Sequence, residues 1–73
     1  MSTDNLIKMA NQIAQYFASE PDEQKAVLGI RNHLQLYWTP GMRKELLAWQ
    51  NSHQGAELHP LAQEAVGGAG WEA

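Results

Sequence analysis

Histidine and carboxylate side chains are the residues of this sequence that could bind a metal ion or transfer protons. The three histidines are His33, His53 and His59, and Gly55 lies between the last two. Zinc sites usually present histidines at tighter spacings and complete four ligands with cysteines or a carboxylate. The chain has no cysteine, and nothing in the spacing completes such a set. We therefore expect no metal site, and we expect the histidines to be surface or helix-capping residues.

The acidic residues form no pair that the pattern would bury together for acid–base catalysis. Asp4, Asp22 and Glu23 stand where helices should begin, and Glu45 and Glu64 fall on polar faces. The glycine-rich segment GGAG has no strand before it and no helix after it that could present amides to a phosphate group. We therefore predict that the chain has no catalytic residues, binds no cofactor itself and is not an enzyme.

Charge and length restrict the classes of partner. The chain has 73 residues and a formal net charge of −3, with five basic residues. Nucleic-acid binding depends on clustered lysine and arginine, and only Arg43 and Lys44 are adjacent, directly before Glu45. No stretch approaches the roughly 20 apolar residues of a membrane span, and the first residues lack the pattern of a signal peptide. We expect a cytoplasmic protein that binds neither nucleic acid nor membrane.

The elements that must position these side chains are helices. Apolar residues recur at helical spacing, which predicts an all-α fold with three main helices. The first helix follows the capping residues of STDN. Its polar face holds Lys8, Asn11, Gln12 and Gln15. Its apolar stripe is Leu6, Met9, Ala10, Ile13, Ala14 and Phe17, flanked by Ile7 and Tyr16.

Two breaks separate the main helices. The segment ASEPDE predicts a second helix over about residues 21–38 with Ser19 as its N-cap. At the second break, Thr39 and Pro40 are typical of the N-cap and first residue of a third helix. Gly55 is a plausible C-cap for that helix.

The C-terminal part is expected to be less regular. A short fourth helix is predicted to begin near Pro60, which gives a single helical domain over residues 1–66. Residues 67–73 are rich in glycine, whose ordering loses the most backbone entropy. We therefore predict a flexible tail that contains Trp71.

The stretch from His33 to Trp49 holds more large apolar and aromatic surface than a small core needs. Its core residues are predicted to be Leu34, Tyr37, Trp38, Met42, Leu46 and Trp49. Leu36 lies opposite Val27 on the helix, beside His33 and Gly29, and so faces away from that core. Gly29 could also let another chain approach closely. Interfaces are enriched in aromatic residues, methionine and arginine. We predict that Asn11, Gln12, His33, Leu36, Tyr37, Trp38, Pro40, Met42 and Arg43 contact a partner.

Several segments in this order resemble the delta subunit of NAD-dependent formate dehydrogenase, over about residues 4–66. They are DNLIKMANQIAQYFASEPD, GIRNHLQLYWTPGMRKELL and LHPL. The matched positions are Leu6, Met9, Ala10, Asn11, Gln12, Ile13, Phe17, Pro21, Asp22, His33, Leu34, Tyr37, Trp38, Pro40, Met42, Arg43, Leu58, Pro60 and Leu61. The chain departs from the pattern at Gln35, Leu36 and Gly41, which are often basic in that family, and at Thr39, which is usually aspartate.

The resemblance implies a non-catalytic accessory subunit of a cytoplasmic formate dehydrogenase that contains molybdenum or tungsten. It implies that the alpha subunit holds the bis-molybdopterin guanine dinucleotide and iron–sulfur clusters, and that the beta and gamma subunits carry electrons to FMN and NAD. It also implies that the delta subunit binds no cofactor and supports assembly or stability by docking on the alpha subunit.

A second hypothesis comes from another class of protein. The second and third predicted helices, joined at Thr39–Gly41, could form a helix-turn-helix that binds DNA. Arg43 and Lys44 would then stand at the start of the recognition helix. The negative net charge argues against this alternative.

Overall fold

The described part of the chain is helical and contains no strand. The computed structural model describes residues 2–53 and 57–67, which form α1 (Thr3–Phe17), α2 (Glu23–Tyr37), α3 (Pro40–His53) and α4 (Pro60–Gly67). The prediction of an all-α fold is confirmed. The predicted C-cap at Gly55 and the predicted tail beyond Gly67, with Trp71, lie outside the described residues.

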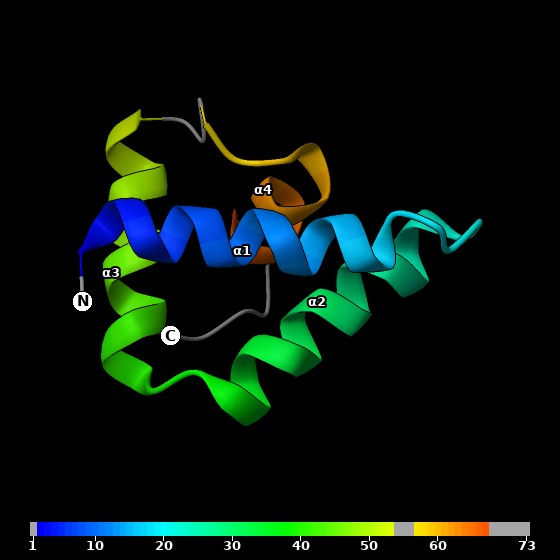
Figure 1. Ribbon diagram of the computed structural model, residues 1–73, viewed down its shortest axis with the longest axis horizontal. Helices are drawn as coiled ribbons and strands as arrows, with labels where there is room; N and C mark the ends of the chain where they lie inside the picture. Colours follow the sequence, from blue (N-terminus) through cyan, green and yellow to red (C-terminus); the bar gives the residue numbers. More distant parts are fainter. Residues whose placement is uncertain (1, 54–56, 68–73) are drawn as a thin grey trace.

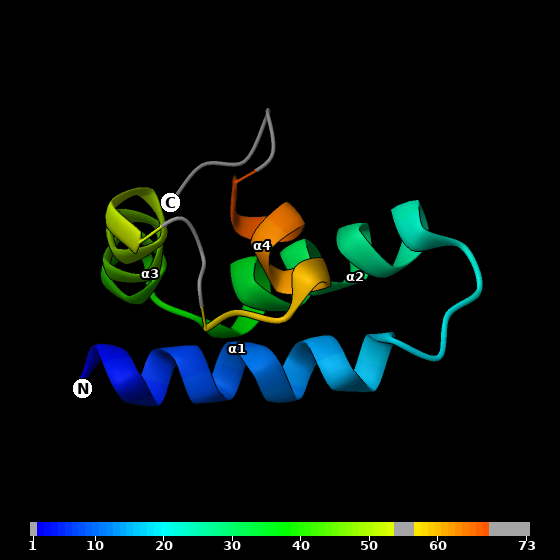
Figure 2. The same cartoon turned by 90° about the horizontal axis from the view of Figure 1, so that it is seen from above.

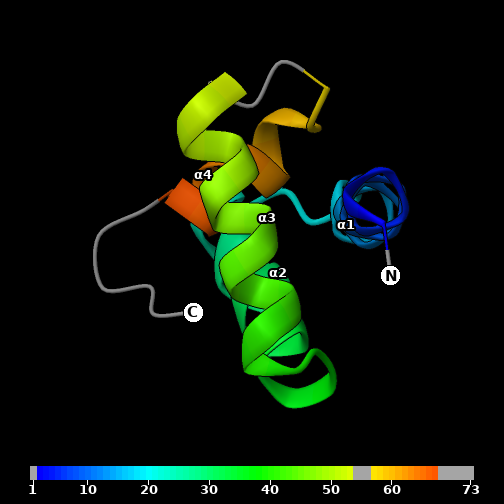
Figure 3. The same cartoon turned by 90° about the vertical axis from the view of Figure 1, so that its left-hand side faces the viewer.

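The short helix α4 lies at the centre of the fold. It stands between α2 and α3, while α1 runs across the same side of all three as a separate layer (Figures 1 and 2). Viewed along its axis, α1 stands beside the other helices (Figure 3). Helix α4 contacts each of the other three helices. The short fourth helix that the sequence predicted is therefore the element on which the three main helices meet.

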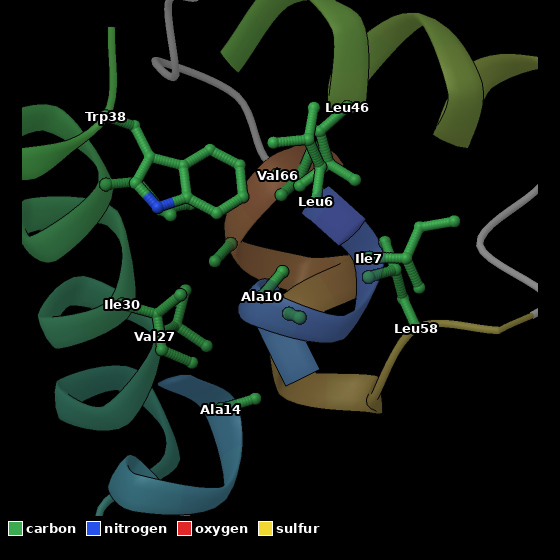
Figure 4. Packing of buried hydrophobic residues seen from close by; sticks show 13 residues of the cluster. Leu6, Ile7, Ala10, Ala14, Val27, Ile30, Trp38, Leu46, Leu58 and Val66 are labelled. Carbon is green, nitrogen blue, oxygen red and sulfur yellow. The ribbon is translucent and has the colours of Figure 1, made fainter. Parts of the chain in front are cut away.

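The core alternates large and small apolar side chains. Large residues from three helices, such as Leu6, Ile30 and Leu46, are fully buried, and alanines such as Ala10 and Ala62 let the helices approach closely (Figure 4). The whole buried cluster is Leu6, Ile7, Ala10, Ala14, Val27, Ile30, Leu34, Trp38, Leu46, Leu58, Ala62, Ala65 and Val66. Met9, Ile13, Phe17, Met42 and Trp49 pack against it partly buried.

One predicted core residue lies in solvent. The side chain of Tyr37 is 72% exposed. Helix α2 ends at this residue, and Trp38 leaves the helix in an extended conformation with φ −95° and ψ 145°. The indole of Trp38 itself lies in the core, as predicted, and is only 5% exposed (Figure 4).

The helix starts follow from local capping, with one correction. Ser2 caps α1 by accepting a hydrogen bond from the Asn5 amide at 3.3 Å. As predicted, Thr39 caps α3, since its hydroxyl accepts a hydrogen bond from the Met42 amide at 3.2 Å. The predicted N-cap of α2, Ser19, is wrong. The Asp22 carboxylate takes that role, because it accepts from the amides of Gln24 and Lys25 at 3.0 and 3.3 Å and carries negative charge at the positive end of the helix dipole.

The ring of Phe17 packs directly on Gly29, between α1 and α2. A Cβ atom placed on Gly29 would lie 2.5 Å from Cε1 and 2.8 Å from Cδ1 of Phe17. The space over Gly29 is therefore occupied by a side chain of the same protein. This corrects the expectation that Gly29 leaves room for another chain.

The substitution Gly29→Ala tests this packing, because its effect on stability should change sign when the ring of Phe17 is removed. In the wild-type background we expect a net loss of stability, because overpacking costs about 1–3 kcal/mol and exceeds the gain of about 1 kcal/mol in helix propensity. In a Phe17→Ala background the clash is gone, and the same change should raise stability by up to about 1 kcal/mol. Urea unfolding of the four proteins measures both effects. A gain in both backgrounds would contradict the close packing of Phe17 on Gly29.

Candidate functional site

An open groove runs between α1 and α2. It has a volume of about 480 Å³ and is lined by Met9, Gln12, Ile13, Tyr16, Phe17, His33 and Tyr37. We call this surface the α1/α2 groove. Among the residues that the structure describes, no aspartate, glutamate, lysine or arginine lines it. The polar groups that it offers are neutral amide, imidazole and hydroxyl groups.

Aromatic rings on both helices border the groove and face solvent. Tyr16 is 78% exposed, and its ring meets the ring of Phe17 edge to face at 5.1 Å. On α2, the ring of His33 lies 4.7 Å from the ring of Tyr37. Contiguous exposed apolar surface of this kind marks interaction sites on soluble proteins. The groove therefore has the character of a surface that binds another molecule.

The structure brings some of the predicted contact residues together. Gln12, His33 and Tyr37 all line the α1/α2 groove. Leu36 is 67% exposed and lies one helical turn beyond His33, on the outer side of α2. Pro40 is exposed at the start of α3. Gln12, His33 and Tyr37 therefore share one groove, and Leu36 is exposed outside its lining.

Two other predicted contact residues belong to the interior. Trp38 is only 5% exposed and is part of the core, so its indole is removed from the candidate docking surface. Met42 is partly buried and packs against the same core. The large side chains at this bend mainly hold α2 and α3 to the rest of the fold.

Asn11 has a structural role that the sequence pattern did not reveal. Its side-chain amide donates to the carbonyl of Glu57 at 2.9 Å, and its Oδ1 accepts from the amide of His59 at 2.8 Å. These bonds fasten the segment before α4 to α1. Asn11 therefore has an internal structural role, and its contact with a partner stays a prediction.

The Arg43 guanidinium caps the C-terminal end of α2. Its Nη1 donates to the carbonyls of Trp38 at 2.9 Å, Gln35 at 3.2 Å and Leu34 at 3.4 Å. The last carbonyls of a helix lack intrahelical donors and carry partial negative charge, so a cation is favourable there. Arg43 therefore has an internal role that the sequence analysis did not predict, and its contact with a partner stays a prediction.

Arg31 performs the same task for α4. Its Nε donates to the carbonyl of Ala65 at 2.9 Å and its Nη2 to that of Glu64 at 3.2 Å. On α3, the buried Gln50 donates from Nε2 to the carbonyl of Gln63 at 2.8 Å. Sequence analysis missed both roles, because each depends on carbonyls that come near only in the folded chain.

Sequence analysis also missed four residues of the groove. Met9, Ile13 and Phe17 were assigned to the core stripe of α1, and their side chains are in fact only partly buried. Tyr16 was placed at the edge of that stripe. The sequence did contain a signal for these groove residues. The apolar face of α1 is wider than the core needs and continues past it on the side of Met9 and Tyr16.

The remaining histidines have local partners. His59 caps α4, since its Nδ1 lies 3.1 Å from the donating amide of Leu61. The ring of His53 stacks on Trp49 with 5.1 Å between centroids.

In residues 2–53 and 57–67, histidine, aspartate and glutamate side chains nowhere gather in threes that could hold a metal ion. None of the helices in these ranges has the length and apolarity needed to cross a bilayer.

Comparison with known proteins identifies the family. No curated protein and no solved structure matches the chain. The family model described as NADH-dependent formate dehydrogenase delta subunit FdsD matches residues 5–66. This match spans most of the 73-residue chain, from Asn5 in α1 to Val66 in α4, and includes the groove and both arginine caps. The chain therefore belongs to the FdsD family of formate dehydrogenase delta subunits.

Proposed function

We propose that this chain is a non-catalytic accessory subunit that docks on the large alpha subunit of a formate dehydrogenase and supports the assembly or stability of that enzyme. The observation that carries the proposal is the uncharged, aromatic α1/α2 groove on a chain whose family is defined as a subunit. A subunit must offer at least one surface to another chain. The groove and the neighbouring Leu36 provide accessible surface of the composition found at protein interfaces.

The proposal places the chemistry on other chains. The alpha subunit would carry the bis-molybdopterin guanine dinucleotide, with molybdenum in our proposal, and iron–sulfur clusters. Beta and gamma subunits would pass electrons to FMN and NAD, and the complex would work in the cytoplasm. The delta chain would contribute contact surface and no cofactor ligand.

The DNA-binding alternative loses its main argument. It required Arg43 at the start of a recognition helix, but Nη1 of this side chain is bonded to the end of α2. Arg31 is similarly bonded to the end of α4. The exposed cations of the described residues are Lys8, Lys25 and Lys44, which are spread over three helices and do not form the cluster that phosphate binding needs.

Leu36 and Leu28 form a matched pair for testing the docking surface. Both are exposed leucines of α2, at 67% and 58%, but Leu28 lies toward α4 beside Arg31 and Glu64. We expect Leu36→Asp to leave the helicity of the isolated chain unchanged and to weaken assembly about tenfold or more, as loss of an interface anchor does. Leu28→Asp should change neither property.

The measurement is affinity purification of the tagged chain from a host grown with formate and molybdate. Mass spectrometry would quantify the co-eluting large subunit, an assay would follow formate-dependent NAD reduction, and circular dichroism of the isolated chains would report folding. A wild-type chain that elutes alone would refute the accessory role. Equal co-elution of the large subunit with both leucine variants would show that Leu36 is not part of the docking surface.

A further inference from the structure

We propose that the α1/α2 groove takes up a single helix of the partner subunit, through a face of that helix that is apolar and carries no charge. This inference rests on the proposed function, because it specifies the surface and the chemistry by which the accessory subunit docks.

The charge distribution of the chain argues for an uncharged occupant. The chain has five basic and eight acidic residues, and none of those within residues 2–53 and 57–67 lines the groove. A charged side chain entering the groove would lose its hydration without meeting an opposite charge, which is strongly unfavourable. Interface cores are depleted of charged residues for this reason. The complementary surface must therefore be apolar with, at most, neutral polar groups.

The shape of the groove argues for a helix. Met9, Ile13 and Tyr16 lie along one side of α1 over a length of about 10 Å, at the helical rise of about 1.5 Å per residue. This length accommodates about two turns of another helix. A helix satisfies its own backbone hydrogen bonds, whereas a loop or an extended segment would bring unpaired amides into an apolar groove. Docking of an amphipathic helix into a groove between helices is a recurring mode of recognition.

The polar groups at the margin would fix the orientation of the occupant. Gln12 and His33 line the groove from opposite helices, and the tyrosines at positions 16 and 37 add hydroxyl groups at exposed positions. Tyrosine supplies large apolar area with a polar end that suits the boundary between buried and solvated surface. These residues would form the hydrogen-bonding rim around the apolar contact.

A second copy of this chain is a poorer occupant if it docks through the charged faces of α1 or α3. The exposed residues of α1 include Asp4 and Lys8, and those of α3 include Lys44 and Glu45. A copy would therefore present charges to the groove from either of these helices. A partner helix with an uncharged face avoids this cost.

Photo-cross-linking identifies the occupant directly. The full-length tagged chain would carry p-benzoylphenylalanine in place of Tyr16, with a control that carries it in place of Leu28. After irradiation of the purified formate dehydrogenase complex, mass spectrometry would identify the linked peptide. We expect position 16 to link to a large-subunit segment whose apolar residues recur every three or four positions without charges on that face. A charged segment, a second copy of this chain, or linking from position 28 alone would overturn the inference.

A competition measures the contribution of the rim. Wild-type chain and a Tyr16→Asp/Tyr37→Asp variant, with different tags, would be co-expressed, and their ratio in the complex would be determined. Both tyrosines are exposed, so the isolated variant should keep its helicity by circular dichroism. We expect the variant to be incorporated at least about 30-fold less than wild type, and Leu28→Asp to be incorporated equally. Retention of the complex should be insensitive to salt, because no ion pair crosses the groove.

The outcomes separate the inference from the proposed function. If wild-type chain enters no complex, the accessory role fails and the inference fails with it. If wild-type chain enters the complex and the double variant enters equally well, the accessory role stands and the groove is not the docking site. Release of wild-type chain by moderate salt would likewise overturn an uncharged contact.

Discussion

Replacing Trp38 with alanine will unfold most of the isolated chain. The indole is 5% exposed and belongs to the buried cluster. Removing a buried tryptophan costs about 3–5 kcal/mol, from lost burial and from the cavity that remains. A core of this size rarely supplies more than about 3–5 kcal/mol in total. The substitution should therefore cancel the entire free energy of unfolding of the domain.

Far-UV circular dichroism and urea titration measure this loss, and Trp49→Ala is its control. Trp49 is only partly buried and packs at the edge of the core, with its ring stacked on His53. The control should retain a cooperative transition at a lower midpoint. A Trp38→Ala chain with the helicity and midpoint of wild type would show that the indole does not hold α2 and α3 to the core.

Replacing Arg43 with alanine will lower the free energy of unfolding by about 2–3 kcal/mol, the range expected for a charged donor lost from partly buried acceptors. The change leaves the carbonyls at the end of α2 without the donor that Nη1 provides, at distances of 2.9–3.4 Å. It also removes a positive charge from the negative end of the helix dipole. The transition between α2 and α3 should loosen as a result.

Two substitutions sharpen this test. Arg43→Lys keeps the charge but replaces the guanidinium, whose Nη1 alone meets the three carbonyls, by an ammonium on a flexible stem, so it should recover less than half of the loss. Lys44→Ala removes the adjacent exposed cation and should leave the urea midpoint unchanged. Equal destabilisation by Lys44→Ala and Arg43→Ala would attribute the effect to net charge rather than to capping.

Local signals were sufficient to predict the helices. Thr39 and Pro40 define the start of α3 because a capping hydroxyl followed by proline acts within a few residues. The same reasoning misplaced the start of α2, where Ser19 and Asp22 both satisfy the rules for an N-cap. The choice between them depends on which side chain reaches the first amides, and the carboxylate of Asp22 does so twice.

Contacts between distant segments were beyond the reach of the sequence pattern. Helical periodicity places Asn11 on a polar face, and Arg43 was predicted as a contact residue because interfaces are enriched in arginine. Their roles are set by backbone groups that the fold brings close. For the same reason, Gln12, His33 and Tyr37 were predicted as contact residues, but their meeting with Tyr16 across one groove was not.

The central position of α4 has a consequence for how the protein folds during synthesis. The bonds of Asn11 to Glu57 and His59 join residues 46 and 48 positions apart, and Arg31 reaches residues 33 and 34 positions ahead. Closing such long loops costs entropy before any contact repays it. While the ribosome is still producing α3, α1 and α2 can pack on each other but lack α4, which each of the other helices contacts. Folding should therefore be completed only late, and until then the nascent chain exposes apolar surface that chaperones and proteases recognise.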